Sequence, residues 1–564
     1  MEFYKPEDKG YVENVIRESN IIYTSMEIGL HERVKTYSGG LGILAGDTLR
    51  SCADKHIPVS AITLLYKKGY FKQRIENGEQ YEEEQPWNHK EFLIPFKEHT
   101  VTVHLDREDV HVQPWVGIIV GQDKHLVPII LLDTDIAANS DNSKYITNKL
   151  YDAGQRNRLK QEAVLGIAGK RVLKSFNPYH VHTYHMNEGH AALAPLEDTK
   201  ELRKTYAYSK EDVKNLIKQT HVFTTHTPVP AGHDRFNHSL IDDVLHEEDV
   251  DWTYLRDGEH GEVNMTKLAM TMSHYINGVA KKHGEVSQNM FPEHDIDYIT
   301  NGIHLPTWTH PSIQKVYDDH VPGWRENPDL LQDVEMRVSP DDVWNAHMEA
   351  KRDLIQHVHE RTGEQLDEDK LIIGFARRFA TYKRATLMFQ DLERFKNLSR
   401  GKIQVVFAGK AHPADRAGKD LIKRIHEVKE ELQGDVNIVF VEDYDIDLGK
   451  HLVSGCDIWQ NNPVPPKEAS GTSGMKAVAN GVPNLSVLDG WWIEGVLKEP
   501  DSGWIIHQTG EPQSNLYRQY EDIIQSYYEE PDVFKQKMMK SMKLAAYFNT
   551  HRMVDEYSDK AWNT

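Results

Sequence analysis

The sequence predicts an α/β protein of two lobes, each with a parallel sheet covered by helices. Short β-branched runs recur at intervals of about 30 residues, the spacing of βαβ units. A turn and a helical pattern follow each run, which favours parallel strands. The chain has 564 residues, more than one hydrophobic core usually supports, so we expect at least two domains.

The expected strands are short and rich in valine and isoleucine. In the first half of the chain they begin at Ile21, Ile57, His180, His221 and Ile296. In the second half they begin at Leu371, Lys402, Val436 and Val482. A continuous β-rich stretch over residues 100–136 predicts an antiparallel insertion in the first lobe.

Prolines interrupt the periodic patterns between Pro306 and Pro340. We therefore expect residues 1–312 to form the first lobe and residues 313–564 the second, with the last helix of the chain packing back on the first lobe.

The helix that follows this interruption has clear end signals. Ser339 is a good N-cap, and the proline after it fits the first helical position. Gly363 is expected to end the helix, because glycine adopts the left-handed conformation of a helix C-cap.

Composition argues against several classes of protein. The chain has 66 Lys and Arg against 87 Asp and Glu, a net charge of −21, whereas nucleic-acid binding needs a basic surface. No apolar run approaches the ~20 residues of a membrane-spanning helix, and the N-terminus lacks the apolar core of a signal peptide. The two cysteines, Cys52 and Cys456, fit a reducing compartment. We expect a cytoplasmic protein without nucleic-acid or membrane partners.

Histidines number 31, yet we expect no metal site. The run His180, His182 and His185 looks most like a ligand set. Its spacing on an expected strand does not match a zinc template, so a polar site or a satisfied core is the better interpretation.

The first stretch that indicates chemistry runs from Tyr37 to Gly42 and includes Gly39, Gly40 and Leu41. It lies between an expected strand and a helical stretch. Its glycines allow close backbone approach, and a helix start offers free N–H groups for an anion. A tight strand–helix turn explains the pattern equally well. The register is not that of a dinucleotide-binding loop.

The second stretch is a cationic cluster that directly follows an expected strand: Arg377, Arg378, Lys383 and Arg384. Arginine offers planar forks for phosphate oxygens, and lysine offers a compact charge. Ligands of parallel α/β sheets bind at the carboxyl ends of the strands. We therefore favour an anion site over a solvated loop.

The third stretch is EASGTSGMK, from Glu468 to Lys476. Its small residues suit a phosphate at a helix N-terminus. A lysine beside cationic groups is poised to form a Schiff base through its amine. The order of residues excludes a nucleotide P-loop.

This stretch resembles the pyridoxal-phosphate attachment motif of the glycogen, starch and maltodextrin phosphorylases. Other stretches resemble the same family in the same order: SMEIG, YSGGLGILAGD, MNEGHAAL, ITNGIHLPTW, RRFATYKR, FAGKAHPAD and VEDYDIDLGKHL. The resemblance covers residues 20 to 500 and is closest to the short bacterial and archaeal branch, which lacks the regulatory N-terminal segment of animal enzymes. It implies a GT-B fold, in which two Rossmann-like lobes face each other across a deep cleft.

The resemblance also implies roles for individual residues. Lys476 would form the Schiff base with pyridoxal phosphate, in the second lobe. The cofactor phosphate would be held by Thr472, Ser473 and Arg377, with Tyr444 near the cofactor. The substrate phosphate would be held by Arg378, Lys383 and the Gly39–Gly40 backbone. The reacting glucose would be bound in part by the first lobe, and its expected contacts are His190, Asn301 and Glu468, with Ser470, Gly471, Leu41 and Glu27 nearby.

The implied reaction is phosphorolysis of α-1,4-glucans such as maltodextrin, glycogen or starch. Inorganic phosphate would release α-glucose 1-phosphate from the non-reducing end with retention of configuration, and the cofactor phosphate would act as acid and base. Phosphate suits this role because its second pKa is near ~6. A homo-oligomer is common in the family.

Some positions depart from the family pattern. Gly474 stands where larger relatives carry asparagine, and residues 187–190 read Asn-Glu-Gly-His in place of Asn-Asp-Thr-His. Trp491 and Trp492 replace smaller residues and would either stack on sugar faces or pack in the interior.

Two other functions remain open from the sequence. A glycogen or starch synthase-like transferase that uses a sugar nucleotide would have the same fold, but it would lack a lysine in the GTSGMK context. A glucan-binding protein without activity is disfavoured by the intact Lys476, Arg378, Lys383 and His190.

Overall fold

The computed structural model describes residues 3–151, 154–178, 183–206, 208–246, 250–255 and 261–562. The chain divides into two compact units. The first contains Met1–Tyr70, Glu84–Thr300 and Met553–Thr564, and the second contains Phe71–Glu83 and Asn301–Arg552. Both are mixed α/β structures with large sheets, which confirms the predicted fold class. In the described part of the chain, no helix has both the length and the apolar character needed to cross a lipid bilayer.

The change between the units falls between Thr300 and Asn301, whereas we expected it near residue 312. The prolines explain the difference. Helices α12 (Leu305–Trp308) and α13 (Pro311–His320) each have a proline in the first two positions, so these prolines begin helices of the second unit and do not mark a linker.

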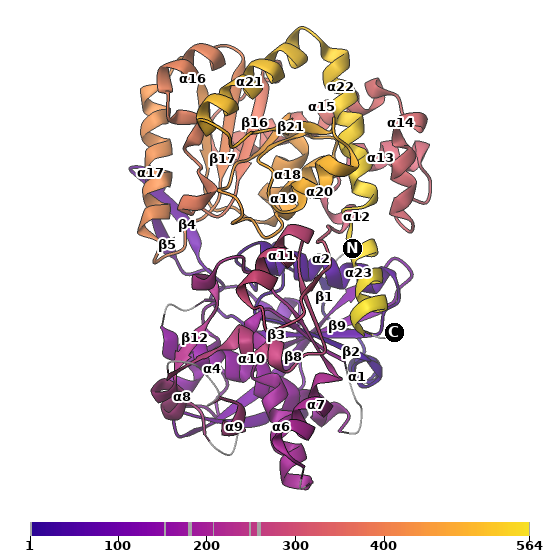
Figure 1. Ribbon diagram of the computed structural model, residues 1–564, viewed down its shortest axis with the longest axis vertical. Helices are drawn as coiled ribbons and strands as arrows, with labels where there is room; N and C mark the ends of the chain where they lie inside the picture. Colours follow the sequence, from indigo (N-terminus) through magenta and orange to yellow (C-terminus); the bar gives the residue numbers. More distant parts are fainter. Residues whose placement is uncertain are drawn as a thin grey trace. The chain divides into compact units, whose positions relative to one another are not determined.

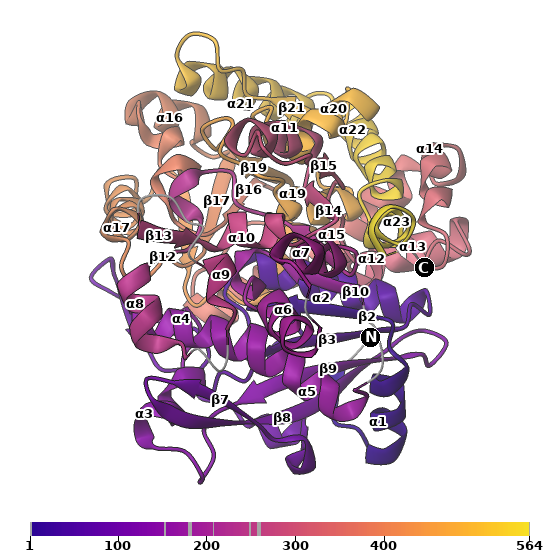
Figure 2. The same cartoon turned by 60° about the horizontal axis from the view of Figure 1, so that its bottom comes forward.

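The first unit is organised around an eleven-stranded sheet. Its main path runs β1-β8-β9-β3-β2-β10-β11-β14-β15, and β6 and β7 both pair with β8. Figure 2 shows β2, β3, β9 and β10 running side by side. The strands are β1 (Phe3–Tyr4), β2 (Ile21–Ser25), β3 (Val59–Leu64), β6 (Ile94–Pro95), β7 (Val101–Leu105), β8 (Glu108–Val120), β9 (Leu126–Asp133), β10 (Thr183–Asn187), β11 (His221–Thr224), β14 (Tyr275–Gly278) and β15 (Asp297–Tyr298).

The expected antiparallel insertion is only partly separate from this sheet. Strands β7 and β8 pair antiparallel, as expected for residues 100–136. Strand β9 pairs in parallel with β3, so it belongs to the parallel core. Its sequence, LVPIILLD, is apolar at almost every position, which is typical of a parallel strand buried on both faces.

Helices and a short second ribbon complete the first unit. The ribbon consists of β12 (Arg235–Asn237) and β13 (Glu262–Asn264). The helices are α1 (Lys9–Glu18), α2 (Gly40–Asp54), α3 (Asp141–Lys144), α4 (Gln155–Ala163), α5 (Gly169–Phe176), α6 (Ala194–Thr205), α7 (Lys210–Lys218), α8 (His238–Val244), α9 (Trp252–Leu255), α10 (Met265–Thr271) and α11 (Lys281–Met290), and α23 (Thr550–Tyr557) ends in this unit.

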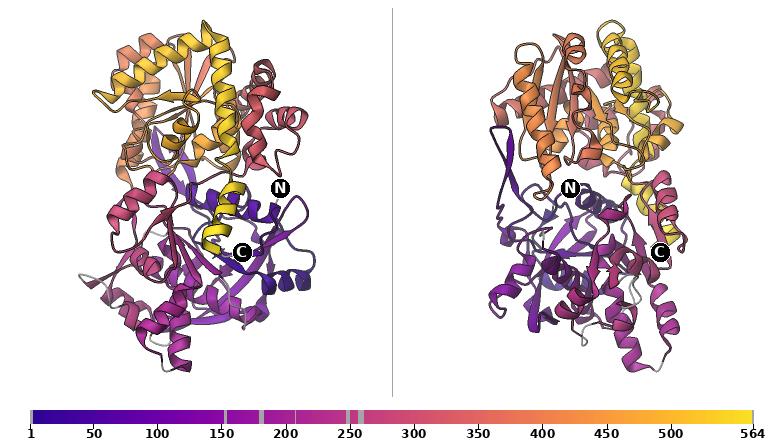
Figure 3. Two further views of the ribbon diagram at one scale, coloured as in Figure 1. Left: turned by 45° about the vertical axis from the view of Figure 1, so that its right-hand side comes forward. Right: turned by 60° about the vertical axis from the view of Figure 1, so that its left-hand side comes forward.

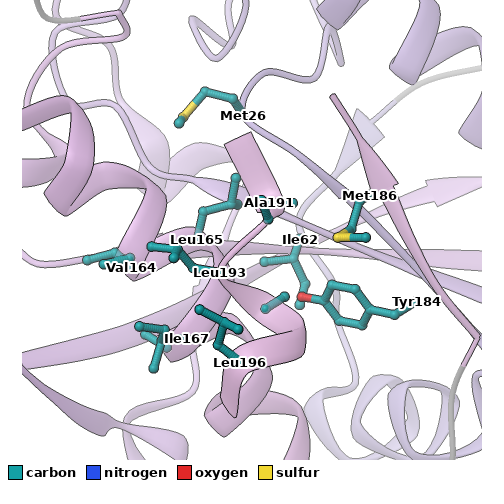
Figure 4. Packing of buried hydrophobic residues seen from close by; sticks show 14 of the residues in the cluster. Met26, Ile62, Val164, Leu165, Ile167, Tyr184, Met186, Ala191, Leu193 and Leu196 are labelled. Atoms are coloured by element: carbon teal, nitrogen blue, oxygen red, sulfur yellow. The ribbon is translucent and has the colours of Figure 1, made fainter. Parts of the chain in front are cut away.

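Two apolar clusters cover the two faces of the first sheet, because successive strand residues point to opposite sides. Ile22 and Ile62 lie in one cluster, whereas Ile21 and Ala61 lie in the other. Figure 4 shows the first of these clusters, where Ile62 of β3 and residues of β10 face the segment that follows α4. This burial on both faces fixes the register of the parallel strands.

The second unit has a six-stranded parallel sheet in the order β18-β17-β16-β19-β20-β21 (Figure 1). The strands are β16 (Leu371–Ala376), β17 (Ile403–Ala408), β18 (Asn437–Val441), β19 (Ile458–Asn461), β20 (Asn484–Ser486) and β21 (Gly503–Ile505). The remaining helices are α14 (Val334–Arg337), α15 (Pro340–Thr362), α16 (Leu392–Ser399), α17 (Arg416–Glu431), α18 (Ile446–Gly455), α19 (Thr472–Ala479), α20 (Trp491–Lys498), α21 (Pro512–Tyr528) and α22 (Pro531–Lys543).

Strand prediction worked for β16, β17, β18 and β20 and missed β19 and β21. The missed strands have three or four residues each, with polar or glycine positions, and so they resemble turns in the sequence. Helix α15 confirms its predicted ends. The Ser339 side chain accepts a hydrogen bond from the Asp342 N–H, and Gly363 has φ 75°.

A hairpin from early in the chain belongs to the second unit. Strands β4 (Lys72–Glu76) and β5 (Glu79–Glu83) lie beside α17, as Figure 3 shows in indigo and orange. Lys423 and Lys419 of α17 pair with Glu79 and Glu82, each at 2.7 Å. Glu79 and Glu82 therefore hold the hairpin against α17 by ion pairs.

Beneath the second sheet lies a buried charge network. Lys351 of α15 donates a hydrogen bond to Asp457 at 2.8 Å, and His347 lies 2.9 Å from the same carboxylate. Asp457 also accepts the Ile372 N–H of β16 at 2.7 Å. The side chains of Lys351, His347 and Asp457 have no solvent exposure. Burial alone would raise the pKa of Asp457, but Lys351 and His347 outweigh burial, so the pKa is lowered.

We predict that Lys351→Ala lowers the free energy of unfolding by about 3–5 kcal/mol, because it leaves the Asp457 carboxylate buried without its main counter-charge. Denaturant unfolding monitored by circular dichroism measures the change. The matched control is Lys315→Ala, which removes an exposed ion pair with Asp319 and should change the free energy of unfolding far less. Equal losses in the two variants would contradict the assigned role of the buried network.

Candidate active site

Glu468 is the centre of a buried ion cluster in the second unit. Arg377 directly follows β16, and its Nη2 donates to Oε2 of Glu468 at 2.8 Å. Lys383 Nζ donates to the same oxygen at 2.5 Å. Only 8% of the Glu468 side chain is exposed. Two cations from the predicted anion site and one residue of the EASGTSGMK stretch therefore come together.

The cluster sets the charge state of Glu468. Burial alone would raise the pKa of its carboxyl, but Arg377 and Lys383 outweigh burial and hold the pKa at about 2. Glu468 is thus ionised at neutral pH. The local charge of the three groups is +1, so the cluster still attracts an anion.

The other two cations of the cluster have different positions. Arg378 is exposed. Arg384 donates to the carbonyl oxygens of Asn462 and Pro463 at 2.7 and 2.8 Å, which fixes the loop after Lys383. The sequence suggested four equivalent cations, whereas the structure uses Arg384 to hold the backbone.

Unpaired polar atoms surround this cluster. Among the described residues, Nη1 of Arg377 and Oγ of Ser470 are buried without a hydrogen-bond partner. Buried polar groups are usually paired, so each such atom needs an explanation, such as a bound ligand. Gly471 follows with φ 88°, a left-handed conformation that leads directly into α19.

Helix α19 begins at Thr472, the first residue after this turn. The N–H groups of its first turn have no partners within the helix and carry its positive dipole end. The Ser473 hydroxyl accepts the Trp459 indole N–H at 3.2 Å, which leaves its own proton available for an acceptor. Thr472 and Ser473 therefore lie where a phosphate group binds best.

Lys476 lies one turn into α19 and is buried, with 6% exposure. Its Nζ lies 3.7 Å from the centroid of the Trp308 ring. A Cβ built on Gly449 would lie 2.7 Å from the Tyr444 hydroxyl and 3.7 Å from the Trp308 ring, so glycine leaves room for both aromatic groups. The predicted pair Lys476 and Tyr444 is thus gathered around Trp308.

Asp489 supports the loop that carries Glu468. Its two carboxylate oxygens accept the N–H groups of Glu468 and Gly490, each at 2.9 Å. The Trp491 N–H donates to the Ser470 carbonyl at 3.0 Å. The pKa of Asp489 is raised to about 6, mainly by burial. The charge of Glu468 also raises this pKa, whereas the two N–H groups lower it.

In the first unit, Glu27 organises the glycine loop. Its Oε2 accepts the N–H groups of Ser38 and Gly39 at 2.5 and 3.1 Å, and Oε1 accepts the Tyr151 hydroxyl at 2.9 Å. The family resemblance implied that the Gly39 N–H binds phosphate. In the structure, this N–H donates to the Glu27 carboxylate instead. Glu27 therefore anchors the glycine loop through these hydrogen bonds.

The glycine loop nevertheless leaves space for a ligand. A Cβ built on Gly39 or on Gly40 would meet nothing within 4 Å. Leu41 follows on the first turn of α2, whose N-cap is Gly39 without a side-chain hydrogen bond. The N-terminus of α2 is thus open on the glycine side, as a backbone-bound anion requires.

His190 lies after β10 in the first unit and is buried. Its Nε2 lies 3.5 Å from Asp234, and within the described residues its Nδ1 has no hydrogen-bond partner. Burial, helped by Arg158, lowers the pKa of His190 to about 3, against the pull of Asp234. The ring is neutral at pH 7, so it can exchange hydrogen bonds with an uncharged hydroxyl group.

Sequence reasoning missed residues that lie near predicted site residues within each unit. Asp489, Trp308 and His226 were not assigned roles. His226 directly follows Thr225 at the end of β11, and its Nε2 contacts Asn187 at 2.7 Å. Its position after a strand, in the run HVFTTHTP, was the available signal. Trp308 ends the quoted stretch ITNGIHLPTW, and Asp489 lies two residues before Trp491.

Other predicted residues have simpler outcomes. Asn301 is buried, and its Oδ1 has no partner among the described residues. The rings of Trp491 and Trp492 are each 1% exposed, so they pack in the interior of the second unit and are not platforms for sugar. A Cβ on Gly474 would lie 2.4 Å from Asn484 Oδ1 and 2.9 Å from the Trp491 ring.

The histidine run is partly outside the described residues, because these exclude His180 and His182. Both ring nitrogens of His185 are used. Nδ1 accepts the Trp562 indole N–H at 3.1 Å, and Nε2 lies 2.8 Å from the Thr224 hydroxyl. His185 is therefore a satisfied core histidine.

Comparison with known proteins shows the family of the chain. A family model described as carbohydrate phosphorylase matches residues 35–166 and 246–499. The chain belongs to the carbohydrate phosphorylase family. The cation cluster, the α19 turn and Lys476 lie inside the matched ranges, whereas Glu27 and His190 lie outside them.

Individual members of the carbohydrate phosphorylase family resemble the chain over most of its length. It is 38% identical to a maltodextrin phosphorylase of Thermococcus litoralis, with 100% of this chain and 73% of the relative covered. It is 33% identical to a glycogen phosphorylase of Aquifex aeolicus, with 96% and 86% covered. It is 32% identical to a glycogen phosphorylase of Mycobacterium tuberculosis, with 86% and 62% covered.

The raised pKa of Asp489 predicts a pH-dependent stability. The folded state keeps a proton that the unfolded chain releases, so this contribution is complete below pH 3.8 and is lost as the pH rises to about 6. Asp489→Asn should flatten the decline over that window, by an amount of at most about 3 kcal/mol.

Urea unfolding at several pH values measures this effect as the difference between wild type and variant. The control, Asp532→Asn, changes an exposed aspartate of the same unit and should give a difference that does not vary with pH. A wild-type slope that persists in Asp489→Asn would show that Asp489 does not titrate in this window.

Proposed function

We propose that this chain is an α-1,4-glucan phosphorylase, which uses inorganic phosphate to release α-glucose 1-phosphate from the non-reducing end of maltodextrin, glycogen or starch. The observation that carries the proposal is the buried Lys476 on α19, a helix that begins two residues after Ser470 and its unpaired Oγ, in a chain of the carbohydrate phosphorylase family. The names of the relatives support the same activity and favour it over a sugar-nucleotide-dependent transferase.

Pyridoxal phosphate fits the residues around Lys476. Lys476 supplies a buried amine, Trp308 offers an aromatic wall, and the start of α19 offers N–H groups for a phosphate. In this proposal Thr472, Ser473 and Arg377 hold the cofactor phosphate, and Tyr444 borders the ring. When bound, the cofactor supplies a phosphate group that exchanges a proton with inorganic phosphate.

The residues of the second unit would bind and orient the substrate phosphate. Arg378 and Lys383 offset its charge, because two phosphates close together repel strongly in a low-dielectric site. Glu468 already neutralises part of Lys383 and Arg377, so phosphate binding and the Glu468 contacts compete for the same donors. Sugar hydroxyls would then bind Glu468, Asn301, Ser470 and Gly471.

The first unit would contribute neutral hydrogen bonds and backbone donors. His190, uncharged at pH 7, is suited to a glucose hydroxyl, and the open backbone at Gly40 and Leu41 is suited to a phosphate oxygen. Glu27 would hold this loop in place. We also propose a cytoplasmic location, which fits the two free, buried cysteines, and a possible homo-oligomer.

Borohydride reduction tests the cofactor. We expect one phosphopyridoxyl group per chain, on the peptide that contains Lys476, as mapped by mass spectrometry. Lys476→Ala should lose the modification and the production of glucose 1-phosphate while keeping its circular dichroism spectrum. The control, Lys467→Ala, changes an exposed lysine nearby and should keep both. Modification at another lysine, or activity in Lys476→Ala, would reject the assignment.

Arg378 tests the phosphate site. Arg378→Ala should raise the KM for phosphate about tenfold or more, because a hydrogen bond to a charged group is worth about 1.5–3 kcal/mol. Steady-state kinetics at saturating maltodextrin measure this change. Arg416→Ala, which removes an exposed arginine of α17, should leave the KM unchanged. An unaltered phosphate dependence in Arg378→Ala would place the anion elsewhere.

A further inference from the structure

Two helices of the second unit bring two imidazoles and a carboxylate together away from the candidate active site. Asp447 and His451 are four residues apart on α18, so they share one face of that helix. His357 lies on α15, which packs against α18. One potential ligand atom from each of the three residues lies within 4.8 Å of the others.

The distances are too long for hydrogen bonds and close to those around a metal ion. His357 Nε2 lies 3.7 Å from Asp447 Oδ2, and His451 Nδ1 lies 3.9 Å from Asp447 Oδ1. Ligand atoms bound tetrahedrally at about 2.0–2.2 Å from Zn²⁺ are separated by about 3.4 Å. The two imidazole rings are stacked, with centroids 4.2 Å apart and planes 6° from parallel, so their nitrogen atoms would share one ion only after at least one ring rotates.

Two other histidine–aspartate pairs of the same unit are hydrogen-bonded, whereas the exposed pair His320 and Asp342 lies 3.9 Å apart. His347 lies 2.9 Å from Asp457, and His310 lies 3.1 Å from Asp353, both at hydrogen-bond distance. In contrast, His357 Nε2 is buried and has no hydrogen-bond partner among the described residues. A buried imidazole nitrogen without a hydrogen-bond partner needs an explanation, and a bound cation between it and the carboxylate would supply one.

We propose that His357, Asp447 and His451 bind a divalent transition-metal ion of the Zn²⁺ class. Two imidazoles favour Zn²⁺, Ni²⁺ or Cu²⁺ over Mg²⁺ and Ca²⁺, which prefer all-oxygen ligands. Water completes the coordination, because the Asp447 and His451 side chains are 39% and 28% exposed. His451 Nδ1 donates to the Asp447 carbonyl at 3.0 Å, so binding through Nδ1 transfers that proton to Nε2 or to solvent.

The bound ion would tie α15 to the first turn of α18. Tyr444 and Asp445 directly precede this helix, and Asp445 already pairs with Arg361 of α15 at 2.8 Å. A metal ion would add a second link at the segment that carries Tyr444. The expected consequence is a higher melting temperature that depends on the metal concentration, because the ion binds the folded chain.

Zinc titration of the purified full chain, stripped with a chelator and dialysed, tests this proposal. Calorimetry should show a Zn²⁺ site whose affinity falls more than about tenfold in His357→Ala and in His451→Ala. Zn²⁺ should also raise Tm in wild type and less in either variant, whereas Mg²⁺ should do neither. His359→Ala, two residues along α15 and exposed, should bind Zn²⁺ as wild type does.

The variant Asp447→Asn distinguishes a loss of metal binding from a folding defect, because it keeps the shape of the side chain and removes its charge. It should weaken Zn²⁺ binding while keeping the metal-free Tm close to that of wild type. Equal Zn²⁺ affinity in wild type, His357→Ala and Asp447→Asn would overturn the proposal. Loss of affinity in His359→Ala to the same extent would do so as well.

Discussion

The second unit depends on a single buried carboxylate shared by two cations. Glu468 accepts hydrogen bonds from both Arg377, at the end of β16, and Lys383, in the following loop. A buried charge is tolerated only when it is paired and hydrogen-bonded. The strand end, the cationic loop and the turn before α19 are therefore fixed relative to one another. In the proposed function, the carboxylate and the substrate phosphate would compete for these two donors.

In the first unit, a buried carboxylate also holds a loop by accepting several hydrogen bonds. Glu27 binds the N–H groups at the start of α2, where an external anion is also expected to bind. In both units a carboxylate of the chain holds in shape a loop for which we propose anion binding. This preorganisation lowers the entropic cost of binding, because the donors are already oriented before a ligand arrives.

The sequence predicted most of the second sheet, and its failures have physical causes. Strands β16 and β17 are mostly apolar runs of six residues, whereas β19 and β21 have only four and three residues, with Gln, Asn or Gly among them, and take their stability from neighbouring strands. The cation cluster was predictable from local density of charge. The partnership of Glu468 with Lys383 was not, since it joins residues 85 positions apart in the chain. The role of Arg384 was missed because the sequence gives no sign of which carbonyl groups need a donor.

The packing at Gly474 has an evolutionary consequence. Any side chain at that position would collide with Trp491 or with Asn484. A chain that acquired asparagine there while keeping the tryptophan would be overpacked, and one that lost the tryptophan first would carry a cavity. The glycine and the tryptophan are therefore expected to be exchanged together across descendants, as one inherited pair.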